Sequence, residues 1–412
     1  MPITPKRPRT PDSSYAWWRL AASLALSTIG GVGLWSAVVV LPTIQAEFAV
    51  GRGGASLPFT ATMVGFAAGG VLMGRVADRF GIMFPLILGA PILGIGFLAA
   101  AFATSYWQFV LVQALLIGML GSAATFGPLV ADVSLWFVKW RGIAVSVVAS
   151  GNYLAGAIWP SILERTIAAV GWRPSYMMIG GFCVVTMMPL ALLLRGRAVI
   201  DDGDRVDPIR MPSTPGRLPL SPAHLQGLLV LAAIACCVAM SMPQVHIIAY
   251  CGDLGYGTAR GAEMLSIMLG LGVVSRLGSG VIADRIGGLK TLILGSVLQW
   301  LSLIAYLPFD GLTSLYIVSA IFGLSQGGIV PNYALVVREY FPAREAGARV
   351  SLVLMSSVVG MALGGWMSGE IYDLTGSYRA AFLNGIGWNL LNLAIAFWLL
   401  MDRFRPRESL AQ

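Results

Sequence analysis

Long uncharged, apolar runs alternate with short polar islands along almost the whole chain. An apolar run of about 20 residues has the length that a helix needs to cross a bilayer. Read with this rule, the pattern predicts twelve membrane-spanning helices, and the polar stretch 196–222 divides them into six and six. The predicted spans cover residues 17–43, 55–76, 82–104, 107–134, 142–170, 175–195, 223–251, 260–283, 289–308, 312–337, 346–372 and 378–402.

The composition also indicates a membrane protein. Of the 412 residues, 57% are apolar and 11% are charged, whereas soluble domains contain about 45–50% apolar and about 25% charged residues. The sequence therefore predicts an all-α polytopic membrane protein and excludes a disordered chain, a collagen-like repeat and a coiled coil. The net charge of +8 does not indicate nucleic-acid binding, because the basic residues lie in loops between the spans.

Lys and Arg are unevenly distributed between the two sets of loops. Few of them fall in the loops predicted to lie outside, namely Arg52, Arg165, Arg173, Arg260 and Arg379. By the positive-inside rule, both termini are predicted to lie in the cytoplasm, and the protein to be integral to the inner (cytoplasmic) membrane. The predicted organisation is an N-terminal tail 1–16, a six-helix bundle 17–195, a cytoplasmic loop 196–222, a second six-helix bundle 223–402 and a C-terminal tail 403–412.

The two halves of the chain repeat a short motif. Residues 74–81 read Gly-Arg-Val-Ala-Asp-Arg-Phe-Gly, and residues 280–287 read Gly-Val-Ile-Ala-Asp-Arg-Ile-Gly. The first copy follows the second predicted span, and the second copy follows the eighth. The same spacing at the same place in both halves predicts two homologous bundles.

The repeated motif resembles the loop signature of the major facilitator superfamily. This resemblance implies an alternating-access transporter, rather than an enzyme, with twelve helices in two pseudo-symmetric six-helix bundles. We expect the motif to form a conformational latch whose ion pairs exist in one state and break in the other. The alternative is that its charges only set the topology of the loops. The expected latch consists of Gly74 and Gly280, which allow close helix contact, and of Asp78, Arg79, Asp284 and Arg285, with Asp132 as an acid for the arginines to face.

Two further stretches resemble signatures of the monocarboxylate porter family, which includes relatives such as oxalate–formate exchangers. Residues 12–17 read Asp-Ser-Ser-Tyr-Ala-Trp, and residues 136–141 read Trp-Phe-Val-Lys-Trp-Arg. Ser13, Ser14 and Tyr15 depart from the strict family pattern in the first stretch, and Trp140 departs from it in the second. The resemblance implies a small organic anion as substrate, with a monocarboxylate such as lactate or pyruvate first. The alternative for the first stretch is an aromatic belt at the membrane surface.

Arg276 is the clearest charge inside a predicted span. A buried Arg costs about 2.5–3.5 kcal/mol on insertion scales, and its counterpart in the first half is the uncharged Gly70. A guanidinium group fits a carboxylate with two parallel hydrogen bonds. We therefore expect Arg276 to bind the substrate anion. The alternatives are a structural pair with an acid such as Glu370, or snorkelling to the membrane surface. The family resemblance supports binding, because an Arg in the eighth span is tied to substrate there.

Other polar and aromatic residues lie on helices that face the pathway in this fold. Each is also explained by a hydrogen bond between helices or by packing. His246 is the candidate for proton coupling, since its ordinary pKa is near 6.5, and a hydrogen bonder at the outer end of the span is the alternative. The family's usual coupling Asp and Lys are absent, with Gly272 in place of the Asp, so symport, exchange and uniport stay open. The remaining substrate-binding candidates are Thr28, Trp35, Gln113, Asn152, Tyr153, Gln244, Asn332 and Tyr333.

No cofactor and no metal is expected, because two His and four Cys without a CxxC pair offer no ligand pattern. The expected partners are the substrate anion, protons if the cycle uses them, and membrane lipid, with the protein as a monomer. A drug or metabolite exporter of the same superfamily is the alternative function. The fifth span, however, lacks the Gly-Pro-x-x-Gly-Gly end of proton-driven exporters, since residues 151–160 read Gly-Asn-Tyr-Leu-Ala-Gly-Ala-Ile-Trp-Pro.

Overall fold

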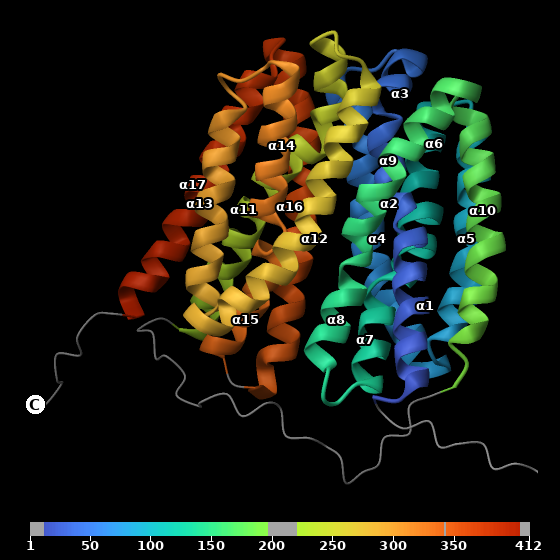
Figure 1. The fold of residues 1–412 in the computed structure, drawn as a ribbon. Coiled ribbons are helices and arrows are strands. Elements are labelled where there is room, and N and C mark those ends of the chain that lie inside the picture. Colours follow the sequence, from blue (N-terminus) through green and yellow to red (C-terminus); the bar gives the residue numbers. More distant parts are fainter. Residues whose placement is uncertain (1–11, 197–220, 342, 404–412) are drawn as a thin grey trace, which may run out of the picture. The chain divides into compact units, whose positions relative to one another are not determined.

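The computed structural model describes residues 12–196, 221–341 and 343–403 (Figure 1). Within these ranges the chain is helical, without strands, and twelve helical segments are long and apolar enough to cross a membrane. The predicted all-α fold with twelve spans is therefore confirmed. The tails and the loop 196–222 lie largely outside the described residues.

Several spans consist of more than one helix. The first six spans contain α1 (Ser14–Gly30), α2 (Val32–Val39), α4 (Arg52–Phe80), α5 (Met83–Ala101), α6 (Tyr106–Val112), the π-helix η1 (Gln113–Gly121), the 3-10 helix η2 (Ser122–Thr125), α7 (Gly127–Trp136), α8 (Arg141–Ala149), α9 (Gly151–Val170) and α10 (Trp172–Leu193), with the short α3 (Leu41–Phe48) between the first two. The last six contain α11 (Pro222–Asp253), α12 (Thr258–Ile286), α13 (Gly288–Ala305), α14 (Leu312–Gln326), α15 (Ile329–Tyr340), α16 (Ala343–Thr375) and α17 (Tyr378–Arg403).

The span boundaries follow from local chemistry. The fifth span runs from Gly142 to Val170, as the apolar pattern predicts. The second ends at Phe80, beyond the predicted 76, because the charged residues of the loop motif occupy the last turn of α4. The final glycines of the two motif copies, Gly81 and Gly287, have φ values of +85° and +88°. Glycine adopts this left-handed conformation without a steric penalty, so both copies end a helix in the same way.

Two compact units emerge from the contacts within the chain. The first contains Met1–Ala37 and Val64–Ile209, and the second contains Val38–Met63 and Arg210–Gln412. Residues 38–63 were predicted to belong to the first bundle. They make their contacts with the second unit instead, where the Thr60 hydroxyl donates to the Ala362 carbonyl oxygen and α3 packs on α11.

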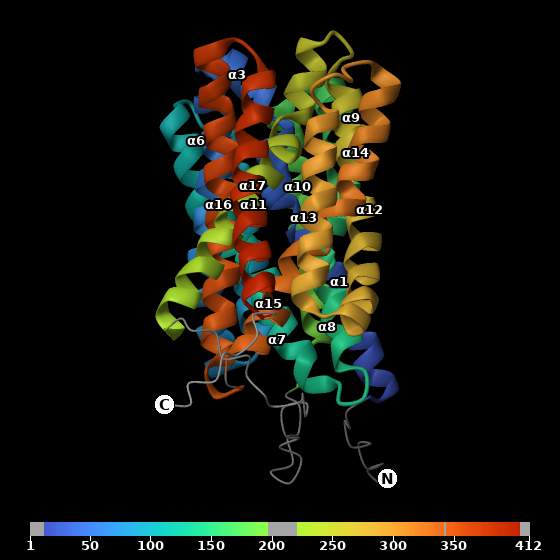
Figure 2. The same cartoon turned by 90° about the vertical axis from the view of Figure 1, so that its left-hand side faces the viewer.

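Close helix packing in each unit depends on small residues. In the first unit α5 and α10 lie side by side, and an added Cβ on Gly180 would come within 2.9 Å of the Gly94 carbonyl oxygen (Figure 1). In the second unit α11 packs against α16 and α17 (Figure 2). Added Cβ atoms on Gly360 and Gly364 of α16 would overlap the backbone of α11. In lipid the hydrophobic effect does not drive helices together. Small residues stabilise the contact instead, because they let the two backbones approach closely.

The fourth and tenth spans break at equivalent places. In the fourth, the π-helix η1 and the 3-10 helix η2 precede Phe126, whose φ and ψ of −124° and −81° are not helical. In the tenth, Gly327 and Gly328 separate α14 from α15. The first and fifth spans also contain turns, at Gly31 and Ser150. Irregular backbone at membrane depth is tolerated where it is buried in protein or lines a cavity, so these breaks indicate where to look for the site.

Candidate functional site

Arg276 lies well inside α12, a helix of 29 residues. Ten residues separate it from the end of the helix, which is about 15 Å at 1.5 Å per residue. Its side chain is half-buried, and its Nε donates a hydrogen bond to the Gly327 carbonyl oxygen at 3.3 Å. The guanidinium group is therefore held at the break between α14 and α15.

Glycines set the distance between Arg276 and its carbonyl partner. Added Cβ atoms on Gly323 and Gly327 of the tenth span would overlap the backbone of α12 at Met268 and Gly272. The two helices thus meet backbone to backbone one turn before Arg276. Gly272, where the resembled family carries an Asp, lies in this contact.

Glu370, which the sequence suggests as an acid partner for Arg276, has a hydrogen-bond partner on its own helix. Glu370 accepts a hydrogen bond from the indole Nε1 of Trp366 at 3.0 Å, one turn earlier on α16. Glu370 is thus bonded on its own helix. A structural pair between Arg276 and an acid stays the alternative to anion binding.

A buried amide pair adjoins the same break. Gln244 on α11 donates from Nε2 to Oε1 of Gln326, the last residue of α14. Among the described residues, the Gln244 Oε1 and the Gln326 Nε2 have no hydrogen-bond partner. The pair therefore leaves one acceptor on Gln244 and one donor on Gln326 without a partner in the described part of the chain. Gln326 directly precedes Gly327, whose carbonyl oxygen accepts from Arg276.

Asn332 and Tyr333 are bonded within the second unit. The Asn332 amide donates to the Gly328 carbonyl oxygen at 2.8 Å, and the Tyr333 hydroxyl donates to Oδ1 of Asn392 on α17. Asn392 in turn donates to the Ser296 hydroxyl at 2.9 Å. All of these side chains are buried. These contacts support the packing alternative for Tyr333, and they show that the twelfth span contributes polar groups to the core.

Most of the candidates in the first unit also have partners. Thr28 donates to the Leu24 carbonyl oxygen, and Gln113 donates to the Tyr176 hydroxyl at 3.1 Å. The Trp35 indole donates to the backbone carbonyl oxygen of Asn152 at 3.1 Å. Tyr153 is buried. The contacts of Gln113 and Trp35 join helices of the unit, whereas that of Thr28 lies within α1.

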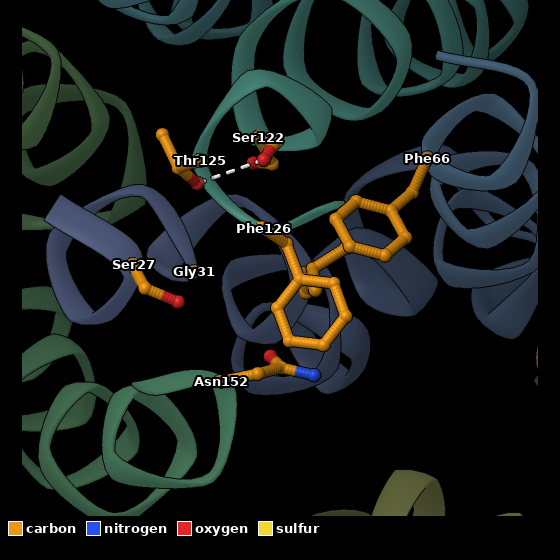
Figure 3. A pocket seen from close by; sticks show the side chains of 8 residues that line it. Ser27, Gly31, Phe66, Ser122, Thr125, Phe126 and Asn152 are labelled. Atoms are coloured by element: carbon orange, nitrogen blue, oxygen red, sulfur yellow. Dashed lines mark hydrogen bonds between the residues drawn. The ribbon is translucent and has the colours of Figure 1, made fainter. Parts of the chain in front are cut away.

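The side chain of Asn152 lies in a small cleft of the first unit (Figure 3). The cleft contains about 160 Å³ of empty space, and almost none of it is wide enough for a water molecule. Figure 3 shows the aromatic rings of Phe66 and Phe126 beside each other, with the Asn152 amide next to them. The cleft is lined by Ser27, Gly31, Leu34, Phe66, Ser122, Thr125, Phe126 and Asn152.

The latch residues differ from the expectation in one pairing. Asp132 accepts from both Nε and Nη2 of Arg19, each at 2.8 Å, and not from an arginine of the loop motif. Arg79 is exposed and its guanidinium group lies 5.3 Å from the Phe80 ring. Arg19 lies inside the first predicted span, 17–43, so the same rule that singles out Arg276, a charge in an apolar run, applies to it as well.

The remaining motif residues lie at exposed helix ends. Asp78, Asp284 and Arg285 are exposed. Within its own unit, neither Gly74 nor Gly280 has another helix close enough to meet an added Cβ. A close helix contact at these two glycines is therefore not formed within either unit.

The two stretches that resemble the monocarboxylate porters contact each other. The Asp12 carboxylate accepts from the backbone N–H groups of Val138 and Lys139 at 3.2 and 3.0 Å. The ring of Tyr15 packs edge-on against Trp136, with 5.3 Å between centroids. The two motifs thus form one contact at the end of the first unit.

His246 is buried and bonded at both ring nitrogens. Nε2 lies 2.8 Å from the Gly365 carbonyl oxygen, and Nδ1 lies 3.1 Å from the Tyr378 hydroxyl. A carbonyl oxygen only accepts, so Nε2 carries the hydrogen and Nδ1 accepts from the Tyr378 hydroxyl. This arrangement holds the neutral imidazole. Arg52 lies near, with its guanidinium group 5.8 Å from the Tyr378 ring.

Comparison with known proteins identifies the family. The profile of the Major Facilitator Superfamily matches residues 23–333 and 300–412. The chain belongs to the major facilitator superfamily. It is therefore a transporter rather than an enzyme, integral to a membrane, and the resemblance of its loop motif is confirmed.

Curated relatives of this transporter carry different names. The "Monocarboxylate transporter 13" of Rattus norvegicus is 26% identical over 331 residues, which cover 80% of this chain and 75% of that protein. The "Agnestins efflux protein AgnL12" of Paecilomyces divaricatus is 22% identical over 348 residues, covering 82% of this chain and 75% of that protein. The chain is thus similar both to a protein named for monocarboxylates and to one named for efflux.

A solved structure has the same fold as this transporter. It is a bacterial homolog of the human lysosomal transporter Spinster in an inward-facing and occupied conformation. The TM-score is 0.74 with 14% sequence identity, over 96% of this chain and 100% of the other. At this identity the likeness shows the fold alone.

Proposed function

We propose that this transporter carries a small organic anion by alternating access, and that Arg276 binds the carboxylate of its substrate. The observation that supports the proposal is the position of Arg276, half-buried in the interior of a membrane-spanning helix. A charge at this depth is costly and is typical of a substrate or ion pathway.

The surroundings of Arg276 suit an anion. Its Nε is fixed by the Gly327 carbonyl oxygen at the break of the tenth span, and such breaks form substrate sites in other transporters. A guanidinium group oriented through Nε can bind a carboxylate with geometric selectivity that a lysine lacks. A monocarboxylate is the first class to test, since one similar protein is named a monocarboxylate transporter.

The orientation in the membrane and the coupling ion belong to the same proposal. The protein lies in the inner (cytoplasmic) membrane with both termini in the cytoplasm, because Lys and Arg are concentrated in the tails and loops predicted to lie on that side. Symport with protons through His246 is an alternative version, which the bonding of both ring nitrogens of His246 does not favour. A monomer is sufficient, as each protein chain contains both units.

An exporter of neutral or cationic metabolites is the second candidate. The similarity to a protein named as an efflux protein favours it. The two candidates make different predictions for Arg276, because only an anion needs its positive charge.

Thermal stabilisation of the purified protein by ligands distinguishes them. Matched pairs of acid and amide, such as lactate with lactamide, vary the charge while keeping the shape. A ligand at 100 times its dissociation constant adds about 2.7 kcal/mol to the stability of the folded state. We expect the acid, and not the amide, to stabilise the wild type and the Arg260→Ala variant, and neither ligand to stabilise Arg276→Ala.

The Arg260→Ala variant is the matched control, because Arg260 is an exposed arginine at the start of the same helix. Arg276→Lys keeps the positive charge but lacks the planar guanidinium group, so it should bind the anion more weakly. If an acid stabilises Arg276→Ala as much as the wild type, the proposal is wrong. If only neutral or cationic compounds stabilise all variants equally, the protein is the exporter.

A further inference from the structure

We propose that the first unit contains a subsite for a hydroxyl group of the substrate, formed by Ser27 and Asn152 in the cleft beside Phe66 and Phe126. The substrate would then be a hydroxylated organic acid. The identity of the acid rests on the proposed function, whereas recognition of the hydroxyl group rests on this cleft alone.

Three interrupted spans meet at the cleft. Gly31 lies at the turn between α1 and α2, and Phe126 lies between η2 and α7. Asn152 follows the turn at Ser150 between α8 and α9. The fourth span adds a π-helix before its break, and π-helical turns often occur at functional sites. Three breaks around one space indicate a place built for more than packing.

Two polar atoms in the cleft have no partner among the described residues. They are the Oγ of Ser27, a residue that is 2% exposed, and the Oδ1 of Asn152. The other hydroxyl groups of the cleft are bonded, since Ser122 donates to the Gly30 carbonyl oxygen and Thr125 to that of Ser122, both at 2.8 Å. A buried polar group without a partner is costly, and its persistence indicates a partner that arrives from outside.

The cleft is closed around this pair, since almost none of its space is wide enough for a water molecule, and it must widen to admit a hydroxyl group of the same size. The backbone around Ser27 is also tightly packed, since an added Cβ on Gly151 would come 2.5 Å from the Ser27 hydroxyl. Gly151 thus allows the hydroxyl to lie against the start of α9, next to Asn152. Figure 3 shows the Ser27 oxygen directed toward the space beside the Asn152 amide.

The chemistry of the two atoms selects a hydroxyl group. A hydroxyl can donate to the Asn152 Oδ1 and accept from the Ser27 hydroxyl at the same time. A carboxylate cannot donate to Oδ1, and no acidic residue lines the cleft to balance an ammonium group. The Phe66 and Phe126 rings, with centroids 5.9 Å apart, provide an apolar surface for the carbon skeleton next to the hydroxyl.

The narrowness of the cleft sets the size of the group. A cleft this narrow suits a single substituent, once it widens, rather than a whole substrate. The skeleton that carries the hydroxyl therefore stays outside, against the two rings.

Matched pairs of ligands test the subsite. Equilibrium binding of 4-hydroxybenzoate and benzoate, and of 3-hydroxybutyrate and butyrate, gives the preference for the hydroxylated member of each pair. One hydrogen bond of ordinary net strength corresponds to a preference of about tenfold at most. We expect the wild type to prefer a hydroxylated acid by about fivefold to tenfold, and Ser27→Ala and Asn152→Ala to lose this preference.

Ser122→Ala is the matched control, because Ser122 lines the same cleft but its hydroxyl is bonded to Gly30. It should keep the wild-type preference. Asn152→Ser retains a hydrogen-bonding group and should keep part of the preference, so it stands in if Asn152→Ala does not fold. If the preference is the same in all variants, or absent from the wild type, the subsite does not exist.

Neutral ligands separate this proposal from that for Arg276. The pair 4-hydroxybenzamide and benzamide carries the same hydroxyl group without the carboxylate. If Arg276 does not bind anions, these amides still show the preference in the wild type and lose it in Ser27→Ala. If the acids bind through Arg276 but neither pair shows a preference, the subsite alone is refuted.

Discussion

Arg19 and Asp132 form a bidentate ion pair inside the first unit, with both N–O distances at 2.8 Å. The Arg19 side chain is fully buried, and its guanidinium group stacks over the Trp136 ring at 4.6 Å. Its Nη1 also donates to the Leu194 carbonyl oxygen at 2.8 Å. One arginine thus joins the first, fourth and sixth spans.

Breaking this pair should destabilise the protein strongly. Removing one partner of a buried ion pair leaves an uncompensated charge and costs about 3–5 kcal/mol. We expect Asp132→Ala to lower the melting temperature in detergent far more than Glu263→Ala does. Glu263 pairs with Arg260 near the surface, where a pair contributes about 0–1 kcal/mol, and it also accepts one hydrogen bond from the Tyr316 hydroxyl, worth about 1 kcal/mol. Equal effects of the two variants would contradict the structural role of Arg19.

Gly327 should not tolerate even a methyl group. An added Cβ would overlap the backbone of Gly272, so Gly327→Ala must push α14 away from α12 and move the carbonyl group that binds Arg276. We expect a loss of about 1–3 kcal/mol in stability, as in overpacked cores, and weaker anion binding. Gly278→Ala on α12 is the control, since nothing lies within 4 Å of the added Cβ. Its stability should stay within about 0.5 kcal/mol of the wild type.

His246 should act as a neutral, structural side chain. Both of its nitrogens are bonded, and Arg52 lies on the far side of its partner, with the guanidinium group 5.8 Å from the Tyr378 ring. We expect His246→Gln to lower the stability by about 1 kcal/mol, the contribution of a hydrogen bond, and to leave the pH profile of transport unchanged. The measurement is uptake at several pH values beside a melting curve. A flattened pH profile with unchanged stability would instead identify His246 as the proton carrier.

Asp12 should protect two backbone amides from exchange with solvent. Its carboxylate accepts from the N–H groups of Val138 and Lys139. In Asp12→Ala these donors lose their partner, so hydrogen exchange of the peptide that contains them should accelerate relative to the wild type. Exchange in α10 should not change. Unaltered protection of both amides would show that the contact between the two motifs does not persist in solution.

The twelve spans were predictable because membrane helices need long apolar runs, which are visible without any tertiary information. The repeat was predictable because both copies of the motif end a helix at a glycine with positive φ, and this need is local. The organisation of residues 38–63 could not be predicted from the sequence. Their contacts with the second unit come from particular groups, such as the Arg52–Asp253 ion pair at 2.9 Å, that no periodicity reveals.

The candidate site was predictable only in part. A charge in an apolar run identified Arg276, but the same argument was not applied to Arg19, which the structure pairs with Asp132. Polar residues such as Gln113 and Tyr333 could not be assigned from sequence, because a side chain that binds substrate and one that bonds a neighbouring helix are the same in type. The helix breaks that surround Asn152 depend on tertiary packing, and sequence gave only the glycines beside them.

Uptake of a radiolabelled monocarboxylate into proteoliposomes tests the central claim most directly. The wild type, Arg276→Lys, Arg276→Ala and Arg260→Ala would be compared at equal amounts of folded protein. We predict uptake by the wild type and Arg260→Ala, reduced uptake by Arg276→Lys and none above empty liposomes for Arg276→Ala. Wild-type rates in Arg276→Ala would show that Arg276 does not bind the transported anion.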